Sequence, residues 1–129
     1  MVMRILIFAV LFTLPALSYT QSSNLYLEFE ATEMFLGPVK KGENVDSTFR
    51  FKNISVEDVI IDLVSTCECT EAKWPKSAIK PGESGEIHFT FDSSKKETEE
   101  ELSIDVFLQN LDKNGNPTAI FLAYTYEYK

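Results

Sequence analysis

Short runs of alternating apolar and polar residues are the feature that most constrains this chain. In the segment Asp46–Lys52, Phe49 and Phe51 alternate with polar neighbours, as they do in a strand whose side chains point alternately to two faces. The same alternation recurs in the ranges Asn24–Thr32, Val59–Ser65, Gly85–Phe91, Leu102–Leu108 and Thr118–Tyr128. Six or seven short strands at this spacing predict an all-β fold, an antiparallel immunoglobulin-like β-sandwich of about seven strands.

The alternation also predicts which side chains face the core. The inward set is Leu25, Leu27, Phe29, Phe49, Phe51, Val59, Ile61, Leu63, Ile87, Phe89, Phe91, Leu102, Ile104, Val106, Leu108, Ile120, Leu122, Tyr124 and Tyr126. The segment Met34–Gly42 is interrupted by Gly37 and Pro38, so it is expected to cross between sheets with a short strand at Val39. The charged segment Asp92–Glu101 is expected to be a solvated loop, because like charges this dense repel and resist burial.

The C-terminal segment is expected to form a hairpin with the strand before it. The pair Asn114-Gly115 favours a tight turn, since both residues tolerate a positive φ. The last strand, Thr118–Lys129, then has two alternatives. In the favoured interpretation, its tyrosines pack into the core. In the other, the strand lies at the edge of a sheet, where it could pair with a strand of a partner protein.

The N-terminus has the pattern of an export signal. Met1–Arg4 carries one positive charge, and Ile5–Leu14 is an apolar run of signal-peptide length that is too short to span a bilayer. We expect residues 1–18 to be a signal peptide that is cleaved after Ser18. The alternatives are cleavage after Thr20 and an uncleaved membrane anchor. The mature domain, residues 19–129, is expected to have no membrane span and to be periplasmic or extracellular.

The charge of the chain limits its partners. The formal net charge is −8, and loss of Arg4 with the leader makes it −9. This balance argues against a nucleic acid or an anionic membrane surface as a partner, because both need clustered lysine and arginine.

The two cysteines, Cys67 and Cys69, are the one candidate site. Export places them where disulfides persist, but an extended C-x-C pair holds its Cβ atoms too far apart, so a disulfide needs a turn at Glu68. Three alternatives stay open: a disulfide or redox-labile pair, two structural thiols, or a reduced pair that binds a soft metal such as Cu(I). Further soft ligands are limited to His88, which is expected to point outward from its strand, and Met34.

Catalysis has little support in the sequence. No nucleophile–base motif, phosphate-binding glycine loop or zinc motif is present, so we expect no enzymatic activity and no cofactor. The tripeptide Asn53-Ile54-Ser55 matches a glycosylation acceptor, but an asparagine that ends a strand is more simply a turn former.

Several segments resemble one bacterial family of exported proteins, common in Bacteroidetes. They are Phe35–Glu43, Thr48–Asn53 (TFRFKN), Ser65–Thr70 (STCECT), Pro81–Gly85 (PGESG) and Phe89–Asp92 (FTFD). The chain thus resembles the domain-of-unknown-function family number fifteen seventy-three from about Phe29 to the C-terminus. Glu68 departs from that family's pattern, which has glycine between the cysteines and so tolerates backbone angles that glutamate adopts at a cost.

The resemblance implies an immunoglobulin-like fold, of the kind seen in the major sperm protein and cilia-associated proteins, and a binding or structural module. We therefore expect a non-enzymatic module that contacts an unidentified envelope or extracellular protein. The alternative is a redox-active or copper-binding protein that uses Cys67 and Cys69.

Overall fold

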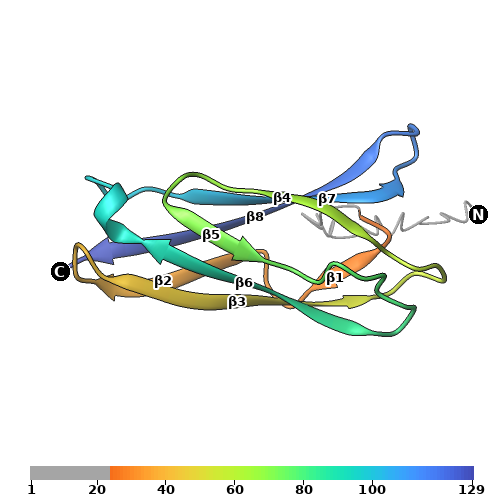
Figure 1. The fold of residues 1–129 in the computed structure, drawn as a ribbon, viewed down its shortest axis with the longest axis horizontal. Coiled ribbons are helices and arrows are strands. Elements are labelled where there is room, and N and C mark those ends of the chain that lie inside the picture. The colour runs from red at the N-terminus through yellow and green to blue at the C-terminus, as the bar shows by residue number, and fades with distance from the viewer. Residues whose placement is uncertain (1–23) are drawn as a thin grey trace, which may run out of the picture.

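The computed structural model describes residues 24–129, which form a sandwich of two four-stranded sheets (Figure 1). The predicted signal peptide, residues 1–18, lies outside the described residues. The strands are β1 (Leu27–Phe29), β2 (Glu33–Val39), β3 (Asn44–Asn53), β4 (Ile61–Ser65), β5 (Thr70–Lys73), β6 (Ser84–Asp92), β7 (Leu102–Leu111) and β8 (Pro117–Tyr128), and a short 3₁₀ helix, η1 (Ser93–Lys95), follows β6. Among residues 24–129, no helix has the length and apolar character needed to cross a membrane.

The strand order confirms the predicted sandwich and adds one parallel pair. Sheet A has the order β1-β3-β6-β5 and sheet B the order β2-β8-β7-β4. All neighbouring strands are antiparallel except β2 and β8. The strand β8 lies between β2 and β7, so the alternative that placed Thr118–Lys129 at a sheet edge is wrong.

The segment expected to be mainly a crossover is a seven-residue strand, β2. Its pairing with β8 shifts register between Phe35 and Pro38, and Gly37 there has φ +83°. A left-handed φ suits glycine, and Pro38 is tolerated because an edge strand needs no N–H on its free side. The glycine and proline thus mark an irregularity within a strand rather than its absence.

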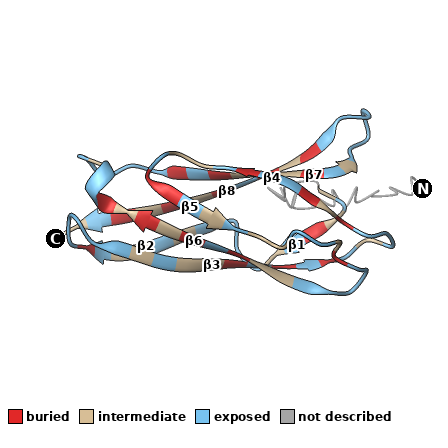
Figure 2. Cartoon of the chain, in the orientation of Figure 1, coloured by how far each residue is buried: buried red, intermediate tan, exposed pale blue. Residues whose placement is uncertain are grey.

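The core lies between the sheets, and buried residues alternate with exposed ones along the strands (Figure 2). The predicted inward faces of β3, β6, β7 and β8 are confirmed, since every residue expected inward on these four strands is buried. The core contains a cluster of aromatic rings, with centroids 4.7 Å apart for Phe89 and Tyr124 and 4.4 Å apart for Phe91 and Tyr126.

Two predicted inward residues face solvent instead. Leu63 is 51% exposed while Val64 is buried, because the register of β4 against β7 shifts between Ile61 and Leu63 and reverses the alternation. Leu25 is 63% exposed, because the side chain of Asn24 accepts hydrogen bonds from the N–H groups of Tyr26 (2.8 Å) and Leu27 (2.9 Å) and forms a turn there. As a result β1 has three residues instead of the nine expected.

The hairpin predicted after β7 is confirmed, and the charged connection before it is confirmed in part. Residues 94–101 are all exposed apart from the half-buried Lys96, but Asp92 is the last residue of β6 and Ser93 is buried at the start of η1. At the β7–β8 hairpin Gly115 has φ +80°, and its N–H donates to the carbonyl of Asp112 over 3.1 Å.

A close contact at Gly85 yields a first testable prediction. A Cβ at this position would lie 2.6 Å from Cζ and 2.9 Å from Cε2 of Phe51, whose ring is buried and cannot move outward freely. We expect Gly85→Ala to lower the free energy of unfolding by about 2 kcal/mol through overpacking. Urea unfolding measures this, with Ser84→Ala at the exposed neighbouring position as the control; equal stability of both variants would contradict the prediction.

Candidate functional site

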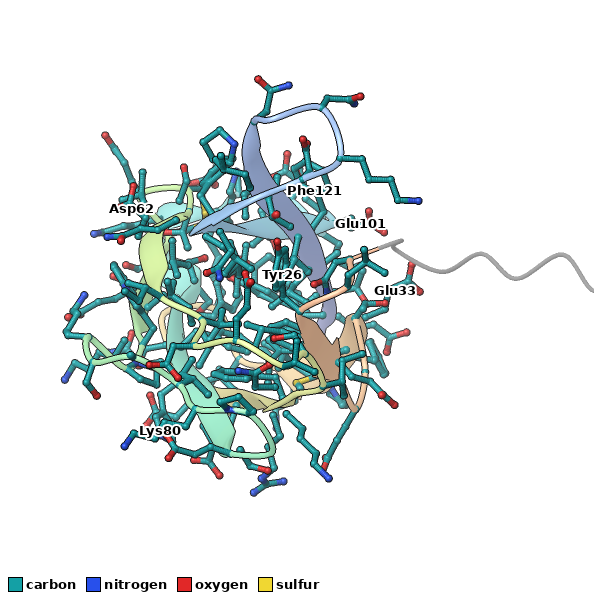
Figure 3. The ribbon with its side chains drawn as sticks, turned by 90° about the vertical axis from the view of Figure 1, so that its right-hand side faces the viewer. Tyr26, Glu33, Asp62, Lys80, Glu101 and Phe121 are labelled. Atoms are coloured by element: carbon teal, nitrogen blue, oxygen red, sulfur yellow. A yellow bond between two sulfur atoms is a disulfide. The ribbon has the colours of Figure 1, made fainter. Side chains whose placement is uncertain are left out.

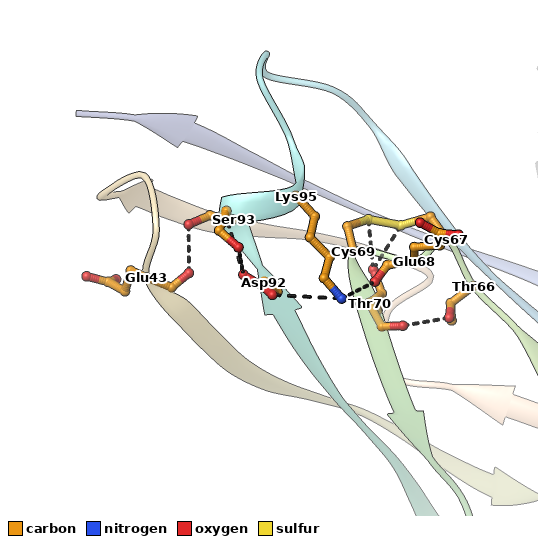
Figure 4. Close-up of polar contacts among 10 residues, drawn as sticks. Glu43, Thr66, Cys67, Glu68, Cys69, Thr70, Asp92, Ser93 and Lys95 are labelled. Carbon is orange, nitrogen blue, oxygen red and sulfur yellow. Dashed lines mark hydrogen bonds and ion pairs between the residues drawn. A yellow bond between two sulfur atoms is a disulfide. The ribbon is translucent and has the colours of Figure 1, made fainter.

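The two cysteines lie in the tight turn between β4 and β5, at the end of the sandwich that also carries η1 (Figure 4). The structure joins Cys67 to Cys69 by a disulfide, with the two Cα atoms 5.2 Å apart. The N–H of Thr70 donates to the carbonyl of Cys67 over 3.1 Å, which closes a four-residue turn with Glu68 at its exposed second position. This is the turn at Glu68 that a disulfide between these residues requires.

Glu68 fits this turn without a left-handed backbone. No residue other than glycine has a positive φ among residues 24–129. The conformational cost expected from glutamate in place of glycine therefore does not arise.

A pair of hydroxyl groups anchors the turn to the core. Thr70 Oγ1 lies 2.5 Å from the hydroxyl oxygen of Tyr124 on β8 and within 3.5 Å of both sulfur atoms. The disulfide sulfurs carry no proton, so a chain in which Tyr124 donates to Thr70 and Thr70 donates to sulfur satisfies both hydroxyls. Burial raises the pKa of Tyr124 to about 12, so its hydroxyl keeps the proton that this chain needs at neutral pH.

Polar contacts from η1 and β6 hold the outer side of the turn (Figure 4). The N–H of Asp92 donates to the carbonyl of Cys69 over 2.8 Å, and Lys95 Nζ donates to the carbonyl of Glu68 over 3.3 Å. The hydroxyl and N–H of Ser94 donate to Asp92, and the hydroxyl contact is the main cause that lowers the pKa of that carboxyl. The C-x-C turn is thus held by contacts from β8, β6 and η1.

The two sulfurs differ in access. Cys69 is 2% exposed, whereas Cys67 is only partly buried. Thiol–disulfide exchange begins with attack on an accessible sulfur, so Cys67 is the atom at which an external thiol would attack. Chemically, the arrangement can accept two electrons and two protons and become a dithiol.

The soft ligands considered with the cysteines lie in other settings. His88 points outward as predicted, with its ring nitrogens 2.9 Å from Thr48 Oγ1 and 3.1 Å from a Glu86 carboxylate oxygen. Met34 Sδ accepts a hydrogen bond from Ser47 over 2.9 Å. Within residues 24–129 the structure shows no group of three or more His, Cys, Asp or Glu that could hold a metal ion.

A small stability effect is expected for the disulfide. Replacing both cysteines with alanine should lower the free energy of unfolding by only about 1.5 kcal/mol, because the bond closes a ring of very few residues. Urea unfolding of the wild-type chain with and without reductant measures the same quantity. Reductant should leave the double variant unchanged, and a loss several times larger in the reduced wild type would contradict this account.

A second surface feature was not predicted. The outer face of sheet B carries large exposed apolar side chains, with Phe121 64%, Phe35 58% and Leu63 51% exposed. A signal for it was present in the sequence, since Phe107 and Phe121 occupy outward positions on strands whose inward positions are already apolar. We use "the apolar face" below for Phe35, Leu63, Phe107, Ala119, Phe121 and Ala123.

The fold defines an immunoglobulin-like, PapD-like β-sandwich domain. The chain belongs to the family described as "Protein of unknown function (DUF1573)", which matches residues 27–121 and confirms the resemblance noted in the sequence. No match is found among curated proteins.

Three solved structures illustrate this fold. A protein of unknown function from Porphyromonas gingivalis W83 has a TM-score of 0.64 at 17% identity, over 79% of this chain and 46% of that one. The ASH/PapD-like domain 7 of human CEP192 has a TM-score of 0.65 at 11% identity, over 87% and 91% of the two chains. The periplasmic chaperone SfaE has a TM-score of 0.57 at 10% identity, over 80% and 58%. At these identities the likeness shows the fold alone.

Proposed function

We propose that this chain is an exported, non-enzymatic module that binds another protein of the cell envelope or the extracellular space. The observation that carries the proposal is the apolar face. Solvent-facing positions of an antiparallel sheet are ordinarily polar, and large exposed apolar patches mark interaction sites. Here the outer face of sheet B exposes two phenylalanines and a leucine by more than half of their surface.

The outer face of sheet A provides the contrast within the same molecule. Its outward residues form exposed ion pairs, such as Arg50 Nε with Glu86 Oε1 at 3.1 Å. A charged face of this kind is well solvated and is stable in water without a bound partner. The difference between the two faces supports sheet B as the side that contacts a partner.

Site-specific photo-crosslinking tests the proposal in the cells that express the chain. A photoreactive phenylalanine analogue replaces Phe121 on sheet B or, as the matched control, exposed Lys52 on sheet A. We expect a discrete protein adduct from position 121 and none from position 52. Equal, diffuse crosslinking from both positions would count against the proposal. Intact mass of the exported protein tests the leader, with a mature chain beginning at Tyr19 as the expected result.

A second candidate function is dithiol–disulfide exchange at the C-x-C turn, supported by the disulfide and by the access to Cys67. A partner dithiol would supply two electrons and two protons and would itself become a disulfide. Equilibration with glutathione buffers, followed by alkylation and mass measurement, gives the reduction potential. Competition of the reduced protein with a chromogenic Cu(I) chelator tests the copper alternative. A disulfide that resists reduction, with no copper uptake after forced reduction, would remove this candidate.

A further inference from the structure

The apolar face has members on all four strands of sheet B, and three of these strands contribute to one row. Leu63 on β4 pairs with Phe107 on β7, which pairs with Ala119 on β8, and these three side chains share one cross-strand row. The next row along β8 contains Phe121. Two steps of about 4.8 Å between neighbouring strands give this row a width of about 10 Å, enough for a short strand pair or one helix. Phe35 on β2 extends the face along β8, where it lies opposite Thr125.

The charged residues on the strands of sheet B have one sign. The strands β2, β4, β7 and β8 contain no lysine, arginine or histidine, whereas sheet A has basic residues on β3, β5 and β6. The carboxylates lie among the apolar side chains, because Asp105 pairs with Phe121 and Glu33 pairs with Ala123. A partner that covers Phe121 must therefore also meet Asp105.

A shallow hollow beside β2 shows how such a partner would be held. It is lined by Glu33, Phe35, Glu101, Ala123 and Thr125, among other residues. Figure 3 shows Glu33, Glu101 and Phe121 toward the same side of the sandwich. The aliphatic stem of a lysine or arginine would lie along Phe35 and Ala123, and its charged end would reach the carboxylates.

We infer that the apolar face binds a polypeptide whose apolar side chains alternate with or flank lysine or arginine. This rests on the proposed function and specifies its partner. A second copy of this chain fits poorly, because a two-fold interface would bring the same carboxylates of both copies together on chains of net charge −8. An anionic lipid surface would be repelled by the same charges.

Defined peptides test the chemistry of the partner on the exported, mature protein. Three capped decapeptides are compared by calorimetry: one alternating lysine and phenylalanine, one alternating glutamate and phenylalanine, and one alternating lysine and serine. We expect binding by the first alone, weakened by about tenfold between low and high salt because exposed charges are screened.

Variants assign that binding to the apolar face. Phe121→Ser should lower the affinity for the lysine–phenylalanine peptide by about tenfold or more, as expected for an aromatic anchor. Asp105→Asn should weaken it less and should reduce the salt dependence. Glu28→Gln, which removes an exposed carboxylate from sheet A, is the matched control and should change neither.

Each other outcome overturns the inference. If the lysine–phenylalanine peptide does not bind, or if the glutamate–phenylalanine peptide binds equally well, the inference that the partner is basic is wrong. A photo-crosslinked adduct from position 121 would still support the proposed function in that case. A dimer in sedimentation that Phe121→Ser dissociates makes a second copy the occupant. Binding to phosphatidylglycerol vesicles that Phe121→Ser abolishes, with no protein adduct from position 121, overturns both proposals.

Discussion

Replacing Asn53 with alanine is expected to lower the free energy of unfolding by about 4 kcal/mol, because it leaves buried polar groups without partners. Asn53 ends β3 and is 1% exposed. Its Nδ2 donates to the carbonyls of Glu57 and Ile79, each over 2.8 Å. Its Oδ1 accepts from the N–H of Ser55 over 2.9 Å and from the hydroxyl of Ser55 over 2.7 Å. One side chain thus joins the β3–β4 loop to the segment before β6.

Urea unfolding of three variants distinguishes this role from a general effect of losing an asparagine. Asn44→Ala removes an exposed asparagine from the other end of β3 and should cost less than about 0.5 kcal/mol. Asn53→Asp should destabilise at least as much as Asn53→Ala, since a carboxylate oxygen would then face two carbonyl oxygens. If Asn53→Ala matched Asn44→Ala, the anchoring role would be wrong. The same burial explains why the tripeptide Asn53-Ile54-Ser55 is a turn in the folded chain rather than an accessible acceptor.

The sequence predicted the faces of the long strands but not every strand. The inward residues of β3, β6, β7 and β8 follow from period-two alternation, because regular pairing keeps each parity on one side. The strand β2 escaped prediction because Gly37 and Pro38 resemble a turn, and because its partner β8 lies about ninety residues further along the chain. Leu63 was misplaced because a register shift between paired strands leaves no mark in the sequence of one strand.

The candidate site was located by sequence, but its supports were not. The C-x-C spacing identifies Cys67 and Cys69, yet Thr70 meets Tyr124 across 54 residues, a contact that no local pattern encodes. The apolar face escaped for a related reason. Alternation places Phe107 and Phe121 on the outward side of their strands, but it does not show which outward residues of other strands lie beside them. The strand order and register of sheet B decide that Leu63 lies next to Phe107.

The buried tyrosines of β8 should make the domain lose stability at alkaline pH, by about 3 kcal/mol through Tyr124 alone. Its pKa is 10.0 in the unfolded chain and is raised by burial to about 12 in the folded state. The folded chain therefore holds the proton more tightly, so this contribution is fully present below pH 10 and is lost as the pH rises through about 12. Burial also raises the pKa of Tyr126, which adds to the loss in the same direction.

Comparison with Tyr124→Phe isolates this effect. The variant loses the hydrogen bond to Thr70 and should be about 1 kcal/mol less stable at neutral pH. It has no phenol to ionise, so its free energy of unfolding should fall less than that of the wild type between pH 10 and 12. Urea unfolding followed by Trp74 fluorescence at each pH measures both curves, and lysine titration is common to the two proteins and cancels in their difference. Parallel curves across this range would show that Tyr124 ionises alike in the folded and unfolded chains, and that the hydroxyl pair beneath the C-x-C turn is open to water.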